Sequence, residues 1–268
     1  MDIAVHGVLL SLVIALLGAF LAGSAGAATA FGRAGSHAAV IPFARSCAAG
    51  ILIAIVLRAQ LVSGAVAGDS VDAKAAVAFA LWFVLGATCI AGVFSWYVDP
   101  RSGRGSRPTG APAPLKKSTL IVVTEAIHNA PIGLTLGLLI ASAHASAHPD
   151  AGMTVFAVLG AVALRNAMSS YCIAAPLREY GVRSSRAFWY TIVAGSIQPA
   201  IALIGALLGS IAPGTVPAGH AIAAGSILTL MVGRVVPQTQ ENHRPGWWFA
   251  LTLVVWFAAA MTAFHIVP

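Results

Sequence analysis

Residues 124–133, near the middle of the chain, read TEAIHNAPIG and place an acid, an imidazole, an amide and a proline inside a long apolar run. A carboxylate at bilayer depth is costly unless it is paired or faces a water-filled cavity. Pro131 also frees the backbone carbonyl of Ile127 from its helical hydrogen bond. The stretch therefore predicts a polar centre within a helix, where Glu125, His128 and a free carbonyl could hold a cation.

The composition indicates that this stretch lies in a membrane. Hydrophobic residues make up 59% of the chain and charged residues 9%, and the mean hydropathy is +0.88. A soluble domain has roughly 25% charged residues, so this chain has too little polar surface to remain in water. We predict an all-α polytopic membrane protein with eight transmembrane helices in one domain, residues 1–268. Each expected span has about the 20 apolar residues that cross a bilayer, and the spans lie near residues 3–22, 39–60, 75–97, 118–142, 151–176, 187–210, 216–238 and 247–267.

The basic residues predict the orientation of these spans. With the N-terminus outside, Lys74 is the only basic residue in the outer loops. The inner loops then hold Arg33, Arg45, Arg101, Arg104, Arg107, Lys116, Lys117, Arg178, Arg183, Arg186 and Arg244. The positive-inside rule therefore places both termini outside, with the Pro-, Gly- and Ser-rich segment 98–117 as a cytoplasmic loop. The net charge of +7 is mainly this orientation signal, which argues against nucleic acid as a partner.

Polar residues recur at helical spacing in the middle of the chain. Positions three and four apart share a helix face, so the fourth span presents one stripe of Glu125, His128, Asn129 and Ile132. The fifth span, expected to run antiparallel, carries Arg165, Asn166 and Ser169 at a similar depth. The sixth span is interrupted at Gln198, and the seventh ends on its inner side near Arg234.

These residues give the chain a resemblance to the ZRT/IRT-like (ZIP) metal transporters over residues 118–240. The fourth helix of that family carries His-Asn-x-Pro-Glu-Gly, and residues 128–133 here read HNAPIG. Its fifth helix carries a related element where residues 165–170 read RNAMSS, and its sixth carries Gly-x-x-Glu-Pro where residues 195–199 read GSIQP. The resemblance implies a ZIP-like bundle of eight helices with outside termini, and transport of divalent metal ions, zinc above all.

The chain departs from the family at the acidic positions. The resemblance implies that carboxylates from the fourth and fifth helices bridge two metal ions, but Ile132 and Ser169 occupy those positions here. Gln198 replaces the acid of the sixth helix, and the acidic region of the seventh matches Gly233 and Arg234. The second helix, at residues 62–63, also lacks the family's acid. The sequence thus predicts a degenerate form of the binuclear site.

Arg165 stands where the family has the first ligand of its fifth helix. A guanidinium within about 5 Å of a divalent cation repels it by several kcal/mol at an effective dielectric constant of roughly 20. Glu125 is the only acid inside any expected span. We therefore predict that Arg165 pairs with Glu125 in place of a metal ion.

Two functions of different class remain open from the sequence. The first is a transporter that still moves zinc or another divalent cation, with Glu125, His128 and Asn129 as metal ligands. Its transport pathway would contain Glu125, His128, Asn129, Pro131, Arg165, Asn166, Ser169, Gln198 and Arg234. The second is a ZIP-derived protein without metal transport, which acts as a regulatory or scaffolding subunit or carries an anionic solute past Arg165 and Arg234. The chain has no His-Glu-x-x-His motif and no nucleophile–base pair, so we do not expect an enzyme.

Each polar residue also has a purely structural interpretation. His128 can be a core histidine, the two asparagines can join helices by hydrogen bonds, and Arg234 can extend its charge to the inner interface. We expect no cofactor, apart from a divalent cation as substrate. The expected surroundings are a lipid bilayer, the bacterial cytoplasmic membrane, and a homodimer is one open state of assembly.

Overall fold

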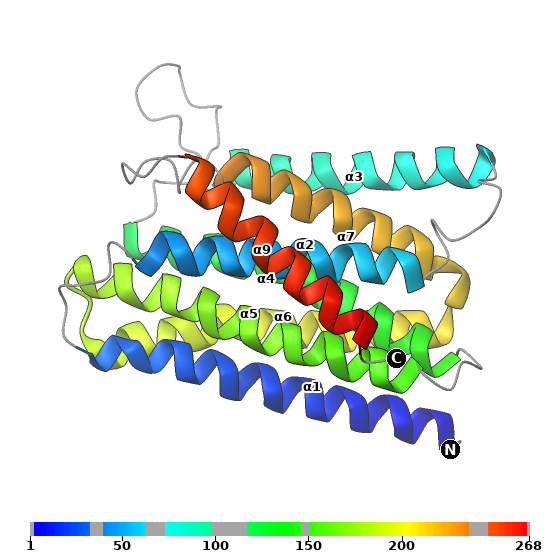
Figure 1. The fold of residues 1–268 in the computed structure, drawn as a ribbon, viewed down its shortest axis with the longest axis horizontal. Helices are drawn as coiled ribbons and strands as arrows, with labels where there is room; N and C mark the ends of the chain where they lie inside the picture. The colour runs from blue at the N-terminus through cyan, green and yellow to red at the C-terminus, as the bar shows by residue number, and fades with distance from the viewer. Residues whose placement is uncertain are drawn as a thin grey trace.

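The computed structural model describes residues 3–32, 40–62, 73–97, 117–145, 151–235 and 246–266. Within these residues the chain forms eight α-helices that lie side by side in one bundle (Figure 1). They are α1 (Ile3–Ala27), α2 (Val40–Val62), α3 (Ala73–Tyr97), α4 (Lys117–Ala145), α5 (Ala151–Glu179), α6 (Ser184–Ile211), α7 (Val216–Leu230) and α9 (Gly246–Ile266). Short 3₁₀ turns follow α1 and precede α7, and the π-helical turn Met231–Val235 continues α7.

The predicted all-α membrane fold is confirmed, and every expected span contains a helix. Six of the described helices are long and apolar enough to cross a membrane, namely α2 to α7. The apolar stretches described in α1 and α9 are shorter, at Leu17–Phe31 and Trp248–Phe264, so eight crossings remain a prediction. The first turn of α1 and the last turn of α9 lie at the same end of the bundle (Figure 1).

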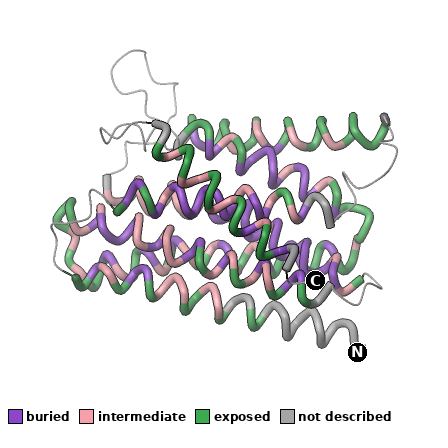
Figure 2. The backbone as a smooth tube through the Cα atoms, in the orientation of Figure 1, coloured by how far each residue is buried: buried purple, intermediate pink, exposed green. Residues whose placement is uncertain are grey.

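Helix α4 is the most deeply buried helix of the bundle. Its residues 128–143 are almost all buried (Figure 2), and it packs along α6. A Cβ atom at Gly133 would collide with the backbone carbonyl of Gln198, and one at Gly137 would collide with that of Ala202. Small residues let membrane helices approach this closely. The glycines of α4 therefore fix the contact that holds the polar stretch in the centre of the molecule.

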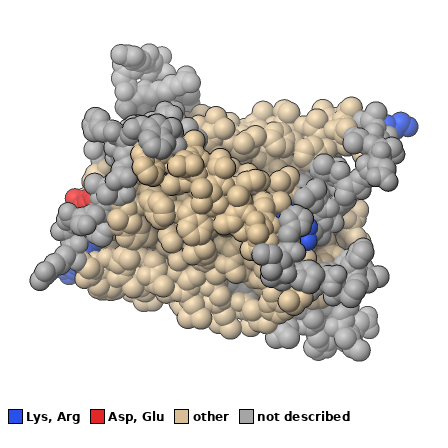
Figure 3. Space-filling model, in the orientation of Figure 1, with Lys and Arg blue, Asp and Glu red and all other residues tan. Residues whose placement is uncertain are grey.

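The outer helices present apolar side chains to their surroundings. Helix α3 lies at one edge beside α7, and α1 lies at the opposite edge beside α5 (Figure 1). On α3 the exposed side chains include Val77, Leu81 and Leu85. The lysine and arginine atoms visible in Figure 3 lie toward the two ends of the bundle, with a wide uncharged band between them. This distribution is what a helix bundle in a bilayer requires.

Candidate functional site

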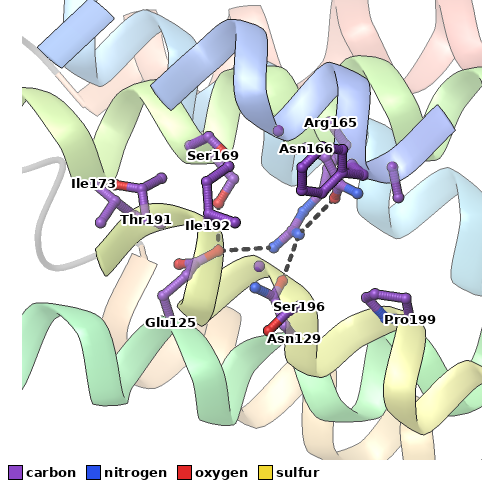
Figure 4. Close-up of a pocket in the computed structure, with 15 residues that line it drawn as sticks. Glu125, Asn129, Arg165, Asn166, Ser169, Ile173, Thr191, Ile192, Ser196 and Pro199 are labelled. Atoms are coloured by element: carbon purple, nitrogen blue, oxygen red, sulfur yellow. Dashed lines mark hydrogen bonds and ion pairs between the residues drawn. The ribbon is translucent and has the colours of Figure 1, made fainter. Parts of the chain in front are cut away.

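A buried polar network joins α4 to α5 near the middle of both helices. The Nη2 atom of Arg165 lies 3.5 Å from Oε1 of Glu125. Its Nη1 donates hydrogen bonds to Oδ1 of Asn129 at 2.7 Å and to Oδ1 of Asn166 at 3.1 Å. Figure 4 shows Arg165 reaching from α5 toward both residues of α4. The predicted ion pair between Arg165 and Glu125 is therefore confirmed.

Further hydrogen bonds hold the two α4 partners of Arg165. The hydroxyl of Ser169 donates to Oε1 of Glu125, and Nδ2 of Asn129 donates to the carbonyl of Ala194 on α6 at 3.1 Å. The side chain of Arg165 is 3% exposed and that of Glu125 is 17% exposed. A charge pair this deep in the protein is tolerated only when hydrogen bonds satisfy its remaining atoms, and the network supplies several of them.

Local sequence explains why these side chains meet. Glu125 and Asn129 are four residues apart on α4, and Arg165 and Ser169 are four residues apart on α5, so each pair lies on one helix face. Pro131 lies two residues after Asn129, and α4 continues through it as a helix. The hydroxyl of Thr135 donates to the carbonyl of Pro131 at 3.1 Å. The polar positions are thus held by regular helices and not by a loop.

The four residues of the expected stripe on α4 do not all belong to one site, because Ile132 lies in different surroundings from Glu125 and Asn129. Ile132 is 1% exposed and packs against Ala49 and Leu52 of α2 and Ile227 of α7. Although Ile132 lies on nearly the same face as Glu125, seven residues separate them by about 10 Å along the helix axis. The two residues therefore meet different neighbours, and the position of the absent acid lies in an apolar cluster.

Two further expected site residues lie away from the ion pair. Gln198 is 1% exposed, its backbone carbonyl faces Gly133, and its Nε2 atom has no hydrogen-bond partner among the described residues. Arg234 lies in the turn that continues α7, but its side chain falls outside the part of the structure that is described. The segment 98–116 also falls outside it.

Two cavities lie on either side of the ion pair. The smaller, of about 60 Å³, lies between α1, α4, α5 and α6. The larger, of about 190 Å³, lies between α2, α3, α4, α5 and α7 and is also lined by His128. Four residues line both cavities, namely Glu125, Arg165, Ser169 and Ile173. The ion pair is thus part of the wall that separates the two spaces.

The sequence interpretation misplaced one arginine of this region. The positive-inside pattern places Arg45 in an inner loop, but α2 begins at Val40 and Arg45 lines the larger cavity. The positive-inside pattern counts charges near a helix end without regard to the direction in which they point. The apolar span that began at residue 39 already contained Arg45, and that boundary was the signal for its place in a helix.

The metal-binding capacity of the site is limited by its donor atoms. Glu125 and His128 both line the larger cavity, and the amide oxygen of Asn129 is engaged by Arg165. In the part of the chain that the structure describes, no group of three His, Cys, Asp or Glu side chains is placed to hold a metal ion. The site thus places one carboxylate and one imidazole at the larger cavity, and Arg165 holds that carboxylate in an ion pair.

Comparison with known proteins identifies relatives among zinc transporters. The zinc transporter GufA of Myxococcus xanthus is 31% identical over 146 residues, which are 51% of this chain and 54% of that protein. The zinc transporter ZIP11 of Homo sapiens is 26% identical over 145 residues, 53% of this chain and 40% of that protein. That of Xenopus tropicalis is 34% identical over 65 residues, 24% of this chain and 19% of its own. The chain spans about half the length, or less, of these curated relatives, and no protein-family model matches it.

Proposed function

We propose that this chain, which is homologous to ZIP-family zinc transporters over about half its length, is a multi-pass membrane transporter of divalent cations with zinc as its first candidate substrate. The homology bears out the family resemblance of the sequence, and the relatives are transporters and not enzymes. One observation carries the proposal. The single acid described at the centre of the bundle lies between two cavities, and ionisable groups at this depth in a membrane commonly mark a transport pathway.

The proposed pathway passes the polar network between α4 and α5. Glu125, His128 and Asn129 are the proposed cation ligands. The further residues of the pathway are Pro131, Arg165, Asn166, Ser169, Gln198 and Arg234. The divalent cation needs anionic or polar donors to replace its hydration shell, and Glu125 is the acid that can supply the negative charge.

The proposed transport step begins when Arg165 leaves Glu125. In the described conformation the guanidinium is shared between this carboxylate and the amide oxygens of Asn129 and Asn166. When Arg165 releases Glu125 and Asn129, the amide oxygen of Asn166 remains as its acceptor, so the exchange does not leave the buried guanidinium without a partner. A cation then occupies the position next to Glu125. The site is a degenerate form of a binuclear site, because Ile132, Ser169 and Gln198 supply no carboxylate.

The proposed orientation has both termini outside, in a bacterial cytoplasmic membrane. It rests on the basic residues expected in the inner loops. The common end of the bundle that holds the start of α1 and the end of α9 is consistent with it (Figure 1).

A second candidate function is a ZIP-derived membrane protein that no longer moves metal. Two observations favour it. The carboxylate of Glu125 is already engaged by Arg165 and Ser169, and the described part of the chain contains no group of three His, Cys, Asp or Glu side chains that could hold a metal ion. Such a protein would retain the helix bundle as a regulatory or scaffolding subunit.

Zinc uptake into proteoliposomes distinguishes the two functions. We expect saturable uptake by the wild-type protein, loss of uptake in Glu125→Gln, and unchanged uptake in Glu179→Gln. Glu179 is an exposed acid at the end of α5 and serves as the matched control. Absence of uptake by a folded wild-type protein would reject cation transport and favour the second function. Equal uptake by Glu125→Gln and wild type would remove Glu125 from the pathway.

A further inference from the structure

The larger cavity has an unusual balance of charge for a cation pathway. Two arginines line it, Arg45 from α2 and Arg165 from α5, against one acid, Glu125. That acid already accepts a hydrogen bond from Ser169 and forms the ion pair with Arg165. The cavity therefore has an excess of positive charge, and its one carboxylate is occupied.

Two of the residues that line this cavity have side-chain donors without a partner among the described residues. The Nε atom of Arg165 is buried without a hydrogen-bond partner, and Arg45 has no ion-pair partner among the described residues. The hydroxyl-bearing Thr124 and the ring of His128 also line the space. Buried polar groups are usually hydrogen-bonded, so donors of this number around a cavity point to an acceptor that belongs inside it.

The shape and chemistry of the cavity favour a small oxyanion. A volume of about 190 Å³ exceeds that of several water molecules, each of which takes about 30 Å³ in the liquid. The planar guanidinium group offers paired donors that match the oxygens of phosphate-like anions. Two such groups on different helices can contact one tetrahedral anion from two directions.

We propose that the larger cavity, between α2, α3, α4, α5 and α7, binds a small tetrahedral oxyanion, held by the guanidinium groups of Arg45 and Arg165. Because Arg165 also contacts Glu125, an anion in this cavity competes with that carboxylate for the guanidinium. The anion site does not depend on cation transport, and a protein that moves no zinc can still contain it. The oxyanion is either a free inorganic anion or the phosphate of an anionic lipid headgroup.

Thermal unfolding of the full-length protein in detergent tests the site. Sodium phosphate or sulfate is titrated against sodium chloride at constant ionic strength, so that general salt effects cancel. Specific binding to the folded state raises Tm in a saturable manner. We expect this rise in wild type, and at least a tenfold weaker apparent affinity in Arg45→Gln. Arg58→Gln is the matched control, because Arg58 is on the same helix, donates to Thr154 at 3.3 Å and does not line the cavity.

Further variants and a second probe complete the test. Arg45→Lys keeps the charge but not the paired donors, so it should bind with intermediate affinity even if Arg45→Gln does not fold. Short-chain phosphatidylglycerol replaces the inorganic anion in a second titration, and the probe whose effect requires Arg45 identifies the source of the oxyanion. Absence of a saturable Tm rise with both probes in wild type overturns the proposal. So does a rise of equal affinity in the Arg45 variants and Arg58→Gln.

Discussion

The guanidinium of Arg165 approaches the carboxylate of Glu125 to 3.5 Å across the contact between α4 and α5, and this pair divides two cavities. The Nη1 atom of Arg165 also donates hydrogen bonds to the amide oxygens of Asn129 and Asn166. The pair therefore combines a structural role with control of the one acid described at the centre of the bundle. Predictions about stability and about transport follow from it separately.

The ion pair predicts non-additive effects of substitution. Removal of one member of a buried pair leaves an uncompensated charge and costs about 3–5 kcal/mol. We expect Arg165→Ala and Glu125→Ala each to lower stability strongly, and the double variant to be more stable than either. Unfolding in detergent by increasing denaturant measures all four proteins. Equal tolerance of the three variants would contradict the energetic coupling.

Ser169 is predicted to stabilise the ion pair by its hydrogen bond to Glu125. Ser169→Ala removes the donor and should cost about 1–3 kcal/mol, because the acceptor is partly buried and charged. Ser196→Ala is the matched control, since that exposed hydroxyl donates to the carbonyl of Val193 on its own helix. The same unfolding titration compares the two variants. An equal loss of stability in Ser196→Ala would contradict a stabilising contribution from the hydrogen bond between Ser169 and Glu125.

Gly137 is predicted to be required for the contact between α4 and α6. A Cβ atom there meets the carbonyl of Ala202, so Gly137→Ala should cost about 1–3 kcal/mol through forced helix separation. At Gly160 on α5 no atom of another element lies within 4 Å of the added Cβ. Gly160→Ala should therefore be neutral or slightly stabilising, by up to about 1 kcal/mol. Thermal unfolding of both variants checks the difference, and equal losses would argue against close packing at Gly137.

An acid at position 132, where the family resemblance would place one, is predicted to destabilise this protein. Ile132→Glu buries a carboxylate among the apolar side chains of Ala49, Leu52 and Ile227. The variant should be destabilised by several kcal/mol. Ile132→Leu, which keeps the apolar volume, should cost less than about 1.5 kcal/mol. Their relative expression and Tm in detergent test this, and a stable Ile132→Glu protein would mean that water or a cation reaches this cluster.

The sequence predicted the helices well because each is a long apolar run bounded by polar segments. It also predicted the pairing of Arg165 with Glu125, since two opposite charges in neighbouring apolar spans have few other partners. The separation of Ile132 from the network and the place of Arg45 in a cavity wall were not predicted. These features depend on how helices rotate and cross. Helices that are apolar on nearly every face carry little periodicity from which such rotations can be inferred.

The initial rate of zinc uptake by Arg165→Gln proteoliposomes, relative to wild type, tests the central claim most directly. Loss of the guanidinium frees Glu125 and removes the repulsion of a divalent cation. The account predicts faster zinc uptake in Arg165→Gln, which the further change Glu125→Gln abolishes. An Arg165→Gln protein that is folded and correctly inserted but carries zinc no faster than wild type would contradict the claim that this ion pair controls the pathway.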